Sequence, residues 1–115
     1  MSFRTLRACK SRFGLLLPGT QVKINRPGGL ATALDGTVFF ADSGNDLLRG
    51  YVLRSGHVIE VGGLITAGVP LGGFNGDDQP ADQTEFSEPA DIVITRTGQV
   101  VVADTANGPV RRFAR

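Results

Sequence analysis

The chain has 115 residues, of which 41% are hydrophobic and 20% are charged, and its formal net charge is +1. This balance excludes a disordered chain, and no apolar run approaches the length of a membrane span. Cys9 is the single cysteine, which excludes a disulfide framework and a thiolate metal site.

Residues 1–23 are expected to form a basic leader or a remnant strand. Residues 1–34 hold six basic and no acidic side chains (+6), whereas residues 35–115 hold six basic and eleven acidic ones (−5). The start places apolar side chains roughly on one helical face and arginines largely off it, which is typical of a mitochondrial presequence. The apolar run 15–17 is too short for a secretory signal. The alternative is that 12–17 is the last strand of a preceding repeat, so the compartment stays open.

An internal repeat follows this segment, since residues 24–51 align without a gap with residues 86–113 at an offset of 62. The identical positions include turn formers and charges as well as core residues, which shared hydrophobicity alone would not produce. Self-similarity at a fixed spacing indicates a repeat architecture. The seven identical pairs are Pro27 and Pro89, Gly36 and Gly98, Val38 and Val100, Ala41 and Ala103, Asp42 and Asp104, Asn45 and Asn107, and Arg49 and Arg111.

Each repeat reads as short β-branched strands separated by turns. The runs 38–41 and 100–103 do not alternate, so we expect both faces of these strands to be covered by similar sheets. Residues 57–61 predict one further strand, and the glycine-rich, acidic stretch 62–84 predicts a loop. Four short strands per unit predict an all-β fold made of β-propeller blades.

The order of these residues resembles the NHL repeat: a proline, an apolar strand, a glycine, then VFFAD or VVVAD, an asparagine and an arginine. The insert GHVIEVGG followed by GGFNGDDQPADQTEFSEP is similar to the longer form of that repeat. The resemblance implies four-stranded antiparallel propeller blades that act as a binding platform. Two departures are Gly108-Pro109 in place of Asp46-Leu47, and Gly29 opposite Asp91. Because proline cannot donate to a ladder, we expect a bulge or an edge at Pro109.

Residues 24–85 are therefore expected to form a first NHL-like repeat with its Gly/Asp-rich loop, and residues 86–115 an incomplete second one. Closed propellers have about four to eight blades, so this length predicts a partial propeller of one to two blades. We expect a fragment of a larger propeller, or a unit completed by self-association or by further blades. Such a chain should not behave as a compact monomer, because its sheet faces are uncovered.

The repeated polar residues are expected to be mainly structural. Asp42 and Asp104 each end a strand at a turn, where a carboxylate can accept backbone N–H groups. Arg49 and Arg111 follow seven residues later, so ion pairs with these carboxylates are the natural expectation. The functional alternative is a binding tip on the hairpins, formed by Asp46, Ala106 and Asn107.

No metal or cofactor site is predicted. The acidic loop offers Asp77, Asp78 and Asp82, but it lacks the spacing and the closing glutamate of an EF-hand, so an Asn-Gly/Asp turn is the better interpretation. His57 is the single histidine and stands at the start of an apolar strand, where a structural role is expected.

The resemblance favours a non-catalytic protein-interaction scaffold with an unknown protein partner. One alternative is a lyase- or lactonase-like propeller enzyme, which needs several His or acidic metal ligands converging from different blades. The other is an RNA-binding NHL propeller, which needs a basic face. Because residues 35–115 sum to −5, nucleic acid is an improbable partner for the repeats.

Overall fold

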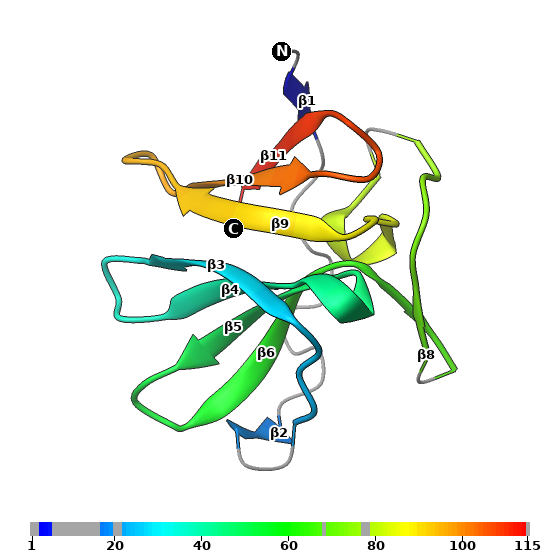
Figure 1. Ribbon diagram of the computed structural model, residues 1–115. Coiled ribbons are helices and arrows are strands. Elements are labelled where there is room, and N and C mark those ends of the chain that lie inside the picture. The colour runs from blue at the N-terminus through cyan, green and yellow to red at the C-terminus, as the bar shows by residue number, and fades with distance from the viewer. Residues whose placement is uncertain (1–2, 6–16, 20–21, 68, 77–78, 115) are drawn as a thin grey trace.

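The computed structural model describes residues 3–5, 17–19, 22–67, 69–76 and 79–114. These residues are all-β, as predicted, with a five-stranded, a four-stranded and a two-stranded sheet. The two larger sheets stack on each other as two propeller blades, with β3 of the first lying beside β9 of the second (Figure 1). No helix within these described ranges is long and apolar enough to cross a membrane.

The five-stranded sheet is called blade 1. Its four main strands follow one another as an antiparallel meander: β3 (Pro27–Thr32), β4 (Val38–Asp42), β5 (Leu47–Val52) and β6 (His57–Gly62). The short strand β2 (Leu17–Pro18) pairs with β6 in antiparallel fashion and extends the outer edge. The strands expected at 38–41 and 57–61 are thus present, and the sheet has one strand more than the expected four.

The four-stranded sheet is called blade 2. It contains the antiparallel strands β9 (Pro89–Ile94), β10 (Gln99–Asp104) and β11 (Val110–Ala114). Its fourth strand is β1 (Phe3–Thr5), which pairs with β11 in parallel fashion and so departs from the expected antiparallel blade. Antiparallel neighbours are commonly joined by hairpins, whereas β1 reaches this edge without a hairpin from β11, so its direction is not fixed in that way.

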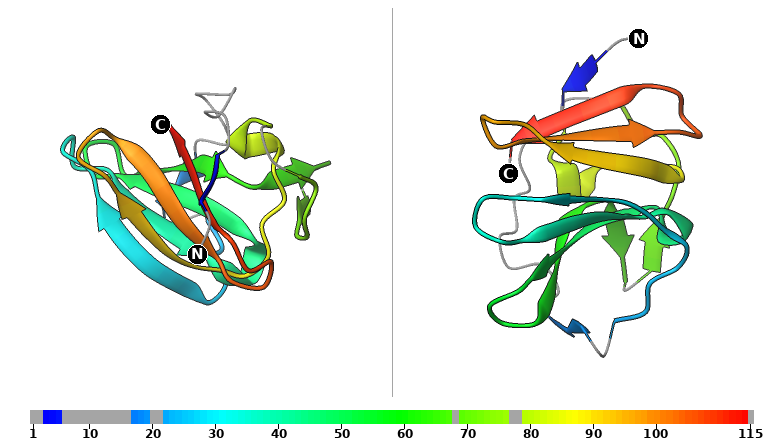
Figure 2. Two further views of the ribbon diagram at one scale, coloured as in Figure 1. Left: turned by 90° about the horizontal axis from the view of Figure 1, so that it is seen from above. Right: turned by 60° about the vertical axis from the view of Figure 1, so that its left-hand side comes forward.

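The segment between the blades is more ordered than the expected loop 62–84. It contains a small hairpin of β7 (Leu64–Thr66) and β8 (Val69–Leu71), and then a 3₁₀ turn at Ala81–Gln83. Figure 2 shows this segment running along one side of both blades. The prediction of a plain loop was wrong here because short pairings in a glycine-rich segment give only a weak periodic pattern.

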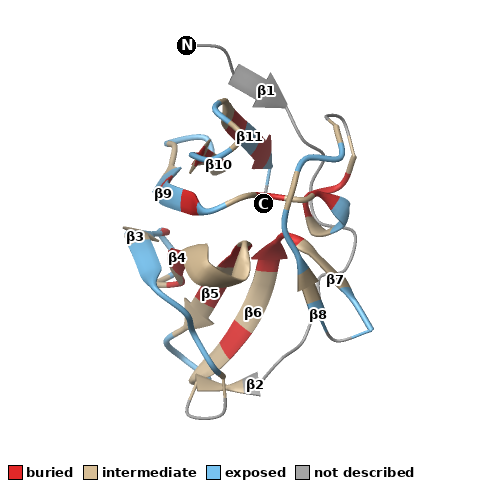
Figure 3. Cartoon of the chain, turned by 45° about the vertical axis from the view of Figure 1, so that its right-hand side comes forward, coloured by how far each residue is buried: buried red, intermediate tan, exposed pale blue. Residues whose placement is uncertain are grey.

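The hydrophobic core lies between the two blades and under the 3₁₀ turn. Blade 1 contributes one face of its sheet, blade 2 contributes the facing side, and the connecting segment adds Ala81 and Phe86. Figure 3 shows buried positions on the strands of both blades. The non-alternating run in β4 is buried from Phe39 to Asp42, whereas buried and half-buried residues alternate along β10. The expectation that both faces of these strands are covered thus holds for β4 and not for β10. The buried core residues are Ala33, Phe39, Ala41, Leu48, Val61, Ala81, Phe86, Ile92, Val100, Val102 and Phe113.

Backbone conformation explains two of the repeated positions. Gly36 and Gly98 have φ angles of 87° and 83°, in the left-handed region that glycine enters without a steric penalty. The residues before the two repeated prolines, Arg26 and Glu88, also match, with φ angles of 49° and 48°. The repeat therefore fixes backbone geometry as well as side-chain chemistry.

The departure at Gly29, together with the neighbouring Gly28, is explained by the contact between the blades. A Cβ atom on Gly28 would clash with the carbonyl oxygen of Ala90, and one on Gly29 would clash with the carboxylate of Asp91. The absence of side chains at Gly28 and Gly29 thus allows the close approach of β9 to β3. At the other departure, Pro109 stands where the first repeat has Leu47, the first residue of β5. β11 begins only at Val110, which is one residue later in the repeat.

Candidate functional site

The same polar cluster occurs once in each blade. In blade 1 the carboxylate of Asp42 accepts the backbone N–H of Asn25 at 2.8 Å through Oδ1, and the side-chain amide of Asn45 at 2.9 Å through Oδ2. Nη1 of Arg49 lies 3.1 Å from the same Oδ2 and also donates to the carbonyl of Lys23 at 3.1 Å. One carboxylate thereby joins the chain before β3, the turn after β4 and the strand β5.

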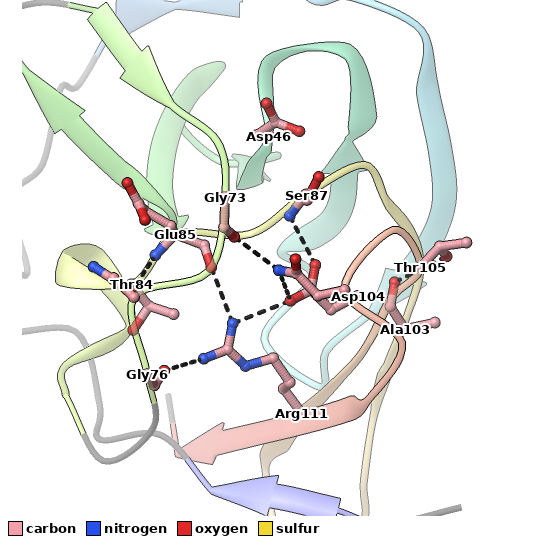
Figure 4. A network of polar contacts seen from close by, with 12 residues as sticks. Asp46, Gly73, Gly76, Thr84, Glu85, Ser87, Ala103, Asp104, Thr105 and Arg111 are labelled. Carbon is pink, nitrogen blue, oxygen red and sulfur yellow. Dashed lines mark hydrogen bonds and ion pairs between the residues drawn. The ribbon is translucent and has the colours of Figure 1, made fainter.

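Blade 2 repeats these bonds at positions 62 residues further on. Asp104 accepts the N–H of Ser87 at 2.8 Å, the amide of Asn107 at 2.9 Å and Nη1 of Arg111 at 3.1 Å. Arg111 also donates to the carbonyl of Glu85 at 3.0 Å, as Figure 4 shows. Both expected Asp–Arg pairs are thus present, and each carboxylate accepts a backbone N–H from the start of its own repeat.

The two clusters differ in how their arginines are enclosed. The side chain of Arg111 is fully buried (0% exposed), whereas that of Arg49 is 11% exposed. The glycine-rich segment covers Arg111: the carbonyl of Gly76 accepts Nη2 at 2.6 Å, and the rings of Phe74 and Phe86 lie 5.2 and 5.1 Å from the guanidinium carbon. A planar guanidinium suits this environment, since it donates in its plane and stacks on aromatic faces.

Arg49 is not covered by the glycine-rich segment and has a second acidic partner, Glu60. Its Nε lies 3.1 Å from Oε1 of Glu60, which stands opposite it on β6. Burial raises the pKa of the Glu60 carboxyl from its ordinary value of 4.5, and the attraction of Arg49 offsets that rise only in part. The sequence analysis missed Glu60, although its place in the strand at 57–61 was a usable signal.

The residues of the suggested binding tip lie at the ends of the hairpins, and all three have internal partners: the backbone N–H of Ala106 donates to the carbonyl of Ser87 at 3.1 Å. The carboxylate of Asp46 accepts the backbone N–H of Glu88 at 2.7 Å, which ties blade 1 to blade 2. The amide of Asn107 donates to the carbonyl of Gly73 at 2.7 Å in addition to Asp104. Ala106 is exposed. Ligand binding at this tip stays a prediction.

Of the metal-ligand candidates in the acidic loop, the structure describes Asp82 alone. Among the described residues, no group of three His, Cys, Asp or Glu side chains could hold a metal ion. Asp77, Asp78 and Cys9 lie outside the described residues. The segment 12–17 suggested as a remnant strand is described only at Leu17, which begins β2. His57 begins β6 and is half-buried.

The outer face of blade 1, which points away from blade 2, is apolar and hollowed. A groove of about 620 Å³ runs over it, and Leu30 remains 68% exposed there. Sequence reasoning expected uncovered sheet faces but did not say which residues form them. The side chains that define this groove are Ile24, Leu30, Val38, Phe40, Tyr51 and Val58. We call this surface the open face of blade 1.

Comparison with known proteins matches residues 86–113 to the family model described as NHL repeat. Over 93 residues the chain is 31% identical to a protein of Arabidopsis thaliana named Protein SUPPRESSOR OF QUENCHING 1, chloroplastic. The aligned stretch makes up 81% of this chain but only 8% of that relative. The similarity therefore concerns a small part of a much longer protein.

Proposed function

Because this chain is an NHL-repeat protein, we propose that it is a non-catalytic protein-interaction scaffold whose binding surface is the open face of blade 1. The observation that carries the proposal is the groove on that face, whose lining combines exposed Leu30 and half-buried Val38 and Tyr51 over the buried ring of Phe40. Contiguous apolar surface of this kind marks protein contacts, because its burial releases ordered water.

The polar clusters support a non-catalytic role. Each oxygen of Asp42 and of Asp104 already accepts at least one hydrogen bond from within the blade. The arginines are occupied by the same carboxylates and by backbone carbonyls. These residues thus hold the strands in place, and the surface for a partner is provided by apolar side chains on a supported sheet.

Site-specific photo-crosslinking tests the proposal. A photoreactive amino acid at position 30 should form covalent links to protein, whereas the same group at position 34, an exposed residue in the turn after β3, should not. A partner identified by mass spectrometry should then bind the purified chain and lose affinity on Leu30→Asp. Equal crosslinking at both positions, or links from position 30 to RNA alone, would contradict the proposal.

A further inference from the structure

We infer that Asn75 is a site of self-modification, whose deamidation is promoted by hydrogen-bond donors that the fold supplies. The side-chain amide is lost as ammonia through a cyclic imide formed with Gly76, and hydrolysis of the imide gives aspartate and isoaspartate. The inference concerns the glycine-rich segment between the blades and does not depend on the proposed function. It follows from a comparison of the two Asn-Gly sequences in the chain, Asn75-Gly76 and Asn107-Gly108.

The reaction needs a backbone nitrogen that can attack the side-chain carbonyl carbon. The nitrogen of Gly76 bonds to Cγ of Asn75, the bond from Cγ to Nδ2 breaks, and Nδ2 leaves as ammonia with the proton that the Gly76 nitrogen gives up. Water then opens the imide at either carbonyl. Because Gly76 has no side chain, nothing on its Cα hinders this approach. No residue that the structure describes accepts a hydrogen bond from the Gly76 N–H, so this nitrogen is available.

Two donors already point at the side-chain oxygen of Asn75. Its Oδ1 accepts the backbone N–H of Glu85 at 3.0 Å and Nε2 of Gln79 at 2.9 Å. Attack by the backbone nitrogen places negative charge on this oxygen, and donors that are already in position stabilise such a charge as it develops. The fold therefore provides Asn75 with an oxyanion site made of one backbone and one side-chain donor.

The surroundings of Asn75 also suit the other steps. Its Nδ2 donates to the carbonyl of Gln83 at 3.0 Å, so the amide group is held at both ends and Cγ keeps one position. Asn75 is exposed, which gives water access to the imide for hydrolysis.

Asn107 lacks these features although the same residue type follows it. The N–H of Gly108 donates to the carbonyl of Asp104 at 2.9 Å, so the attacking nitrogen is already engaged. Within the described part of the chain, no group donates to Oδ1 of Asn107, and its Nδ2 lies 2.9 Å from the Asp104 carboxylate. The charge of that carboxylate opposes a developing oxyanion. We therefore expect the folded chain to modify Asn75 and to protect Asn107.

Modification of Asn75 should weaken the cover of Arg111. The carbonyls of Gly76 and Glu85 accept hydrogen bonds from Arg111 at 2.6 and 3.0 Å, as Figure 4 shows. A carboxylate at position 75 cannot donate to the carbonyl of Gln83, and isoaspartate lengthens the backbone directly before Gly76. Both changes displace the segment that holds these two acceptors. Hydrogen exchange in residues 72–76 should therefore be faster in the modified form than in the unmodified chain.

Peptide mass spectrometry measures the reaction at both sites in one sample. Trypsin cleaves after lysine and arginine, so Asn75 and Asn107 fall in separate peptides, residues 55–96 and 97–111. The folded chain is incubated in mildly alkaline buffer made with water that carries a heavy oxygen isotope. The first peptide should gain labelled carboxylate several-fold faster than the second, whereas the two should react at similar rates in urea. Protection of Asn75 in the folded chain, or equal reaction at both sites, overturns the inference.

Two glutamine variants decide whether the donors promote the reaction. Gln79→Ala removes one donor to Oδ1 and should slow the modification of Asn75 several-fold, whereas mere loosening of the segment would speed it. Gln83→Ala is the matched control, because exposed Gln83 meets Asn75 through its backbone carbonyl, and it should leave the rate unchanged. Circular dichroism checks that both variants stay folded. A faster reaction in Gln79→Ala, or the same rate in both variants, overturns the inference.

Discussion

The guanidinium of Arg111 and the carboxylate of Asp104 meet at 3.1 Å with both side chains fully buried. A buried ion pair adds little net stability over an apolar pair, but removal of one member leaves an uncompensated charge in a medium of low polarity. The geometry of blade 2 therefore depends on both residues being present together.

Asp104→Ala should lower the free energy of unfolding by about 3 to 5 kcal/mol, because it leaves the charge of Arg111 without its carboxylate. It also removes the acceptor for the N–H of Ser87. Urea denaturation followed by circular dichroism measures the change. Glu88→Ala, at an exposed acidic residue, is the control and should change the stability by less than about 0.5 kcal/mol. Equal losses in the two variants would contradict the role assigned to Asp104.

Arg111→Lys should loosen the glycine-rich segment. A lysine ammonium cannot reproduce the planar set of donors that now reaches Asp104, Glu85 and Gly76, nor its stacking on aromatic rings. Hydrogen exchange should become faster in residues 72–76, where the arginine is now covered. Arg96→Lys, in an exposed turn, should leave this exchange unchanged. Protection that persists in Arg111→Lys would show that the segment is held by other contacts.

The stability contributed by Glu60 should decrease as pH rises. Burial raises the pKa of this carboxyl in the folded state above 4.5, so the folded chain holds the proton more tightly than the unfolded chain does. Well below pH 4.5 the carboxyl is protonated in both the folded and the unfolded state, so its ionisation does not lower the free energy of unfolding. Between 4.5 and the raised pKa the wild-type chain should therefore lose stability relative to Glu60→Gln. Denaturation of both proteins across this range measures the difference, and an increase with pH would mean that Arg49 dominates over burial.

Gly28→Ala should weaken the packing between the blades. Its Cβ would meet a backbone carbonyl, that of Ala90, which cannot rotate away, and we expect a loss of about 1 to 3 kcal/mol on unfolding. Gly29→Ala should cost less, because its Cβ meets the flexible carboxylate of Asp91. Adding Asp91→Ala should restore stability to Gly29→Ala, because it removes the clashing carboxylate, and should leave the stability loss of Gly28→Ala unchanged. Thermal melts of these variants would show whether β3 and β9 touch as described.

Much of the fold could be predicted because the repeat is local and periodic. The strands at 38–41 and 100–103 and the turn glycines Gly36 and Gly98 follow from patterns within a few residues. The pairing of Asp42 with Arg49 was also within reach, since both residues belong to one hairpin.

The remaining features depend on contacts that are distant in sequence. Nothing near Arg111 indicates that Phe74 and Gly76 will cover it, because that cover comes from the segment between the blades. The same holds for the groove, whose wall is formed by residues from Pro18 to Val58 on five different strands and their connections. Local patterns identify which residues are apolar, but only the assembled sheets show which apolar face is left without a neighbour.

The parallel pairing of β1 with β11 has a consequence for folding. Because Phe3 lies opposite Val110, the outer strand of blade 2 pairs with a strand that is distant from it in sequence. Blade 1 and the three-stranded part of blade 2 can form from neighbouring hairpins, whereas this last pairing must close a loop that contains nearly the whole chain. Long-range closure slows folding, so the pairing of β1 with β11 should form after the hairpins of blade 2 and, during synthesis on the ribosome, only after β11 has emerged.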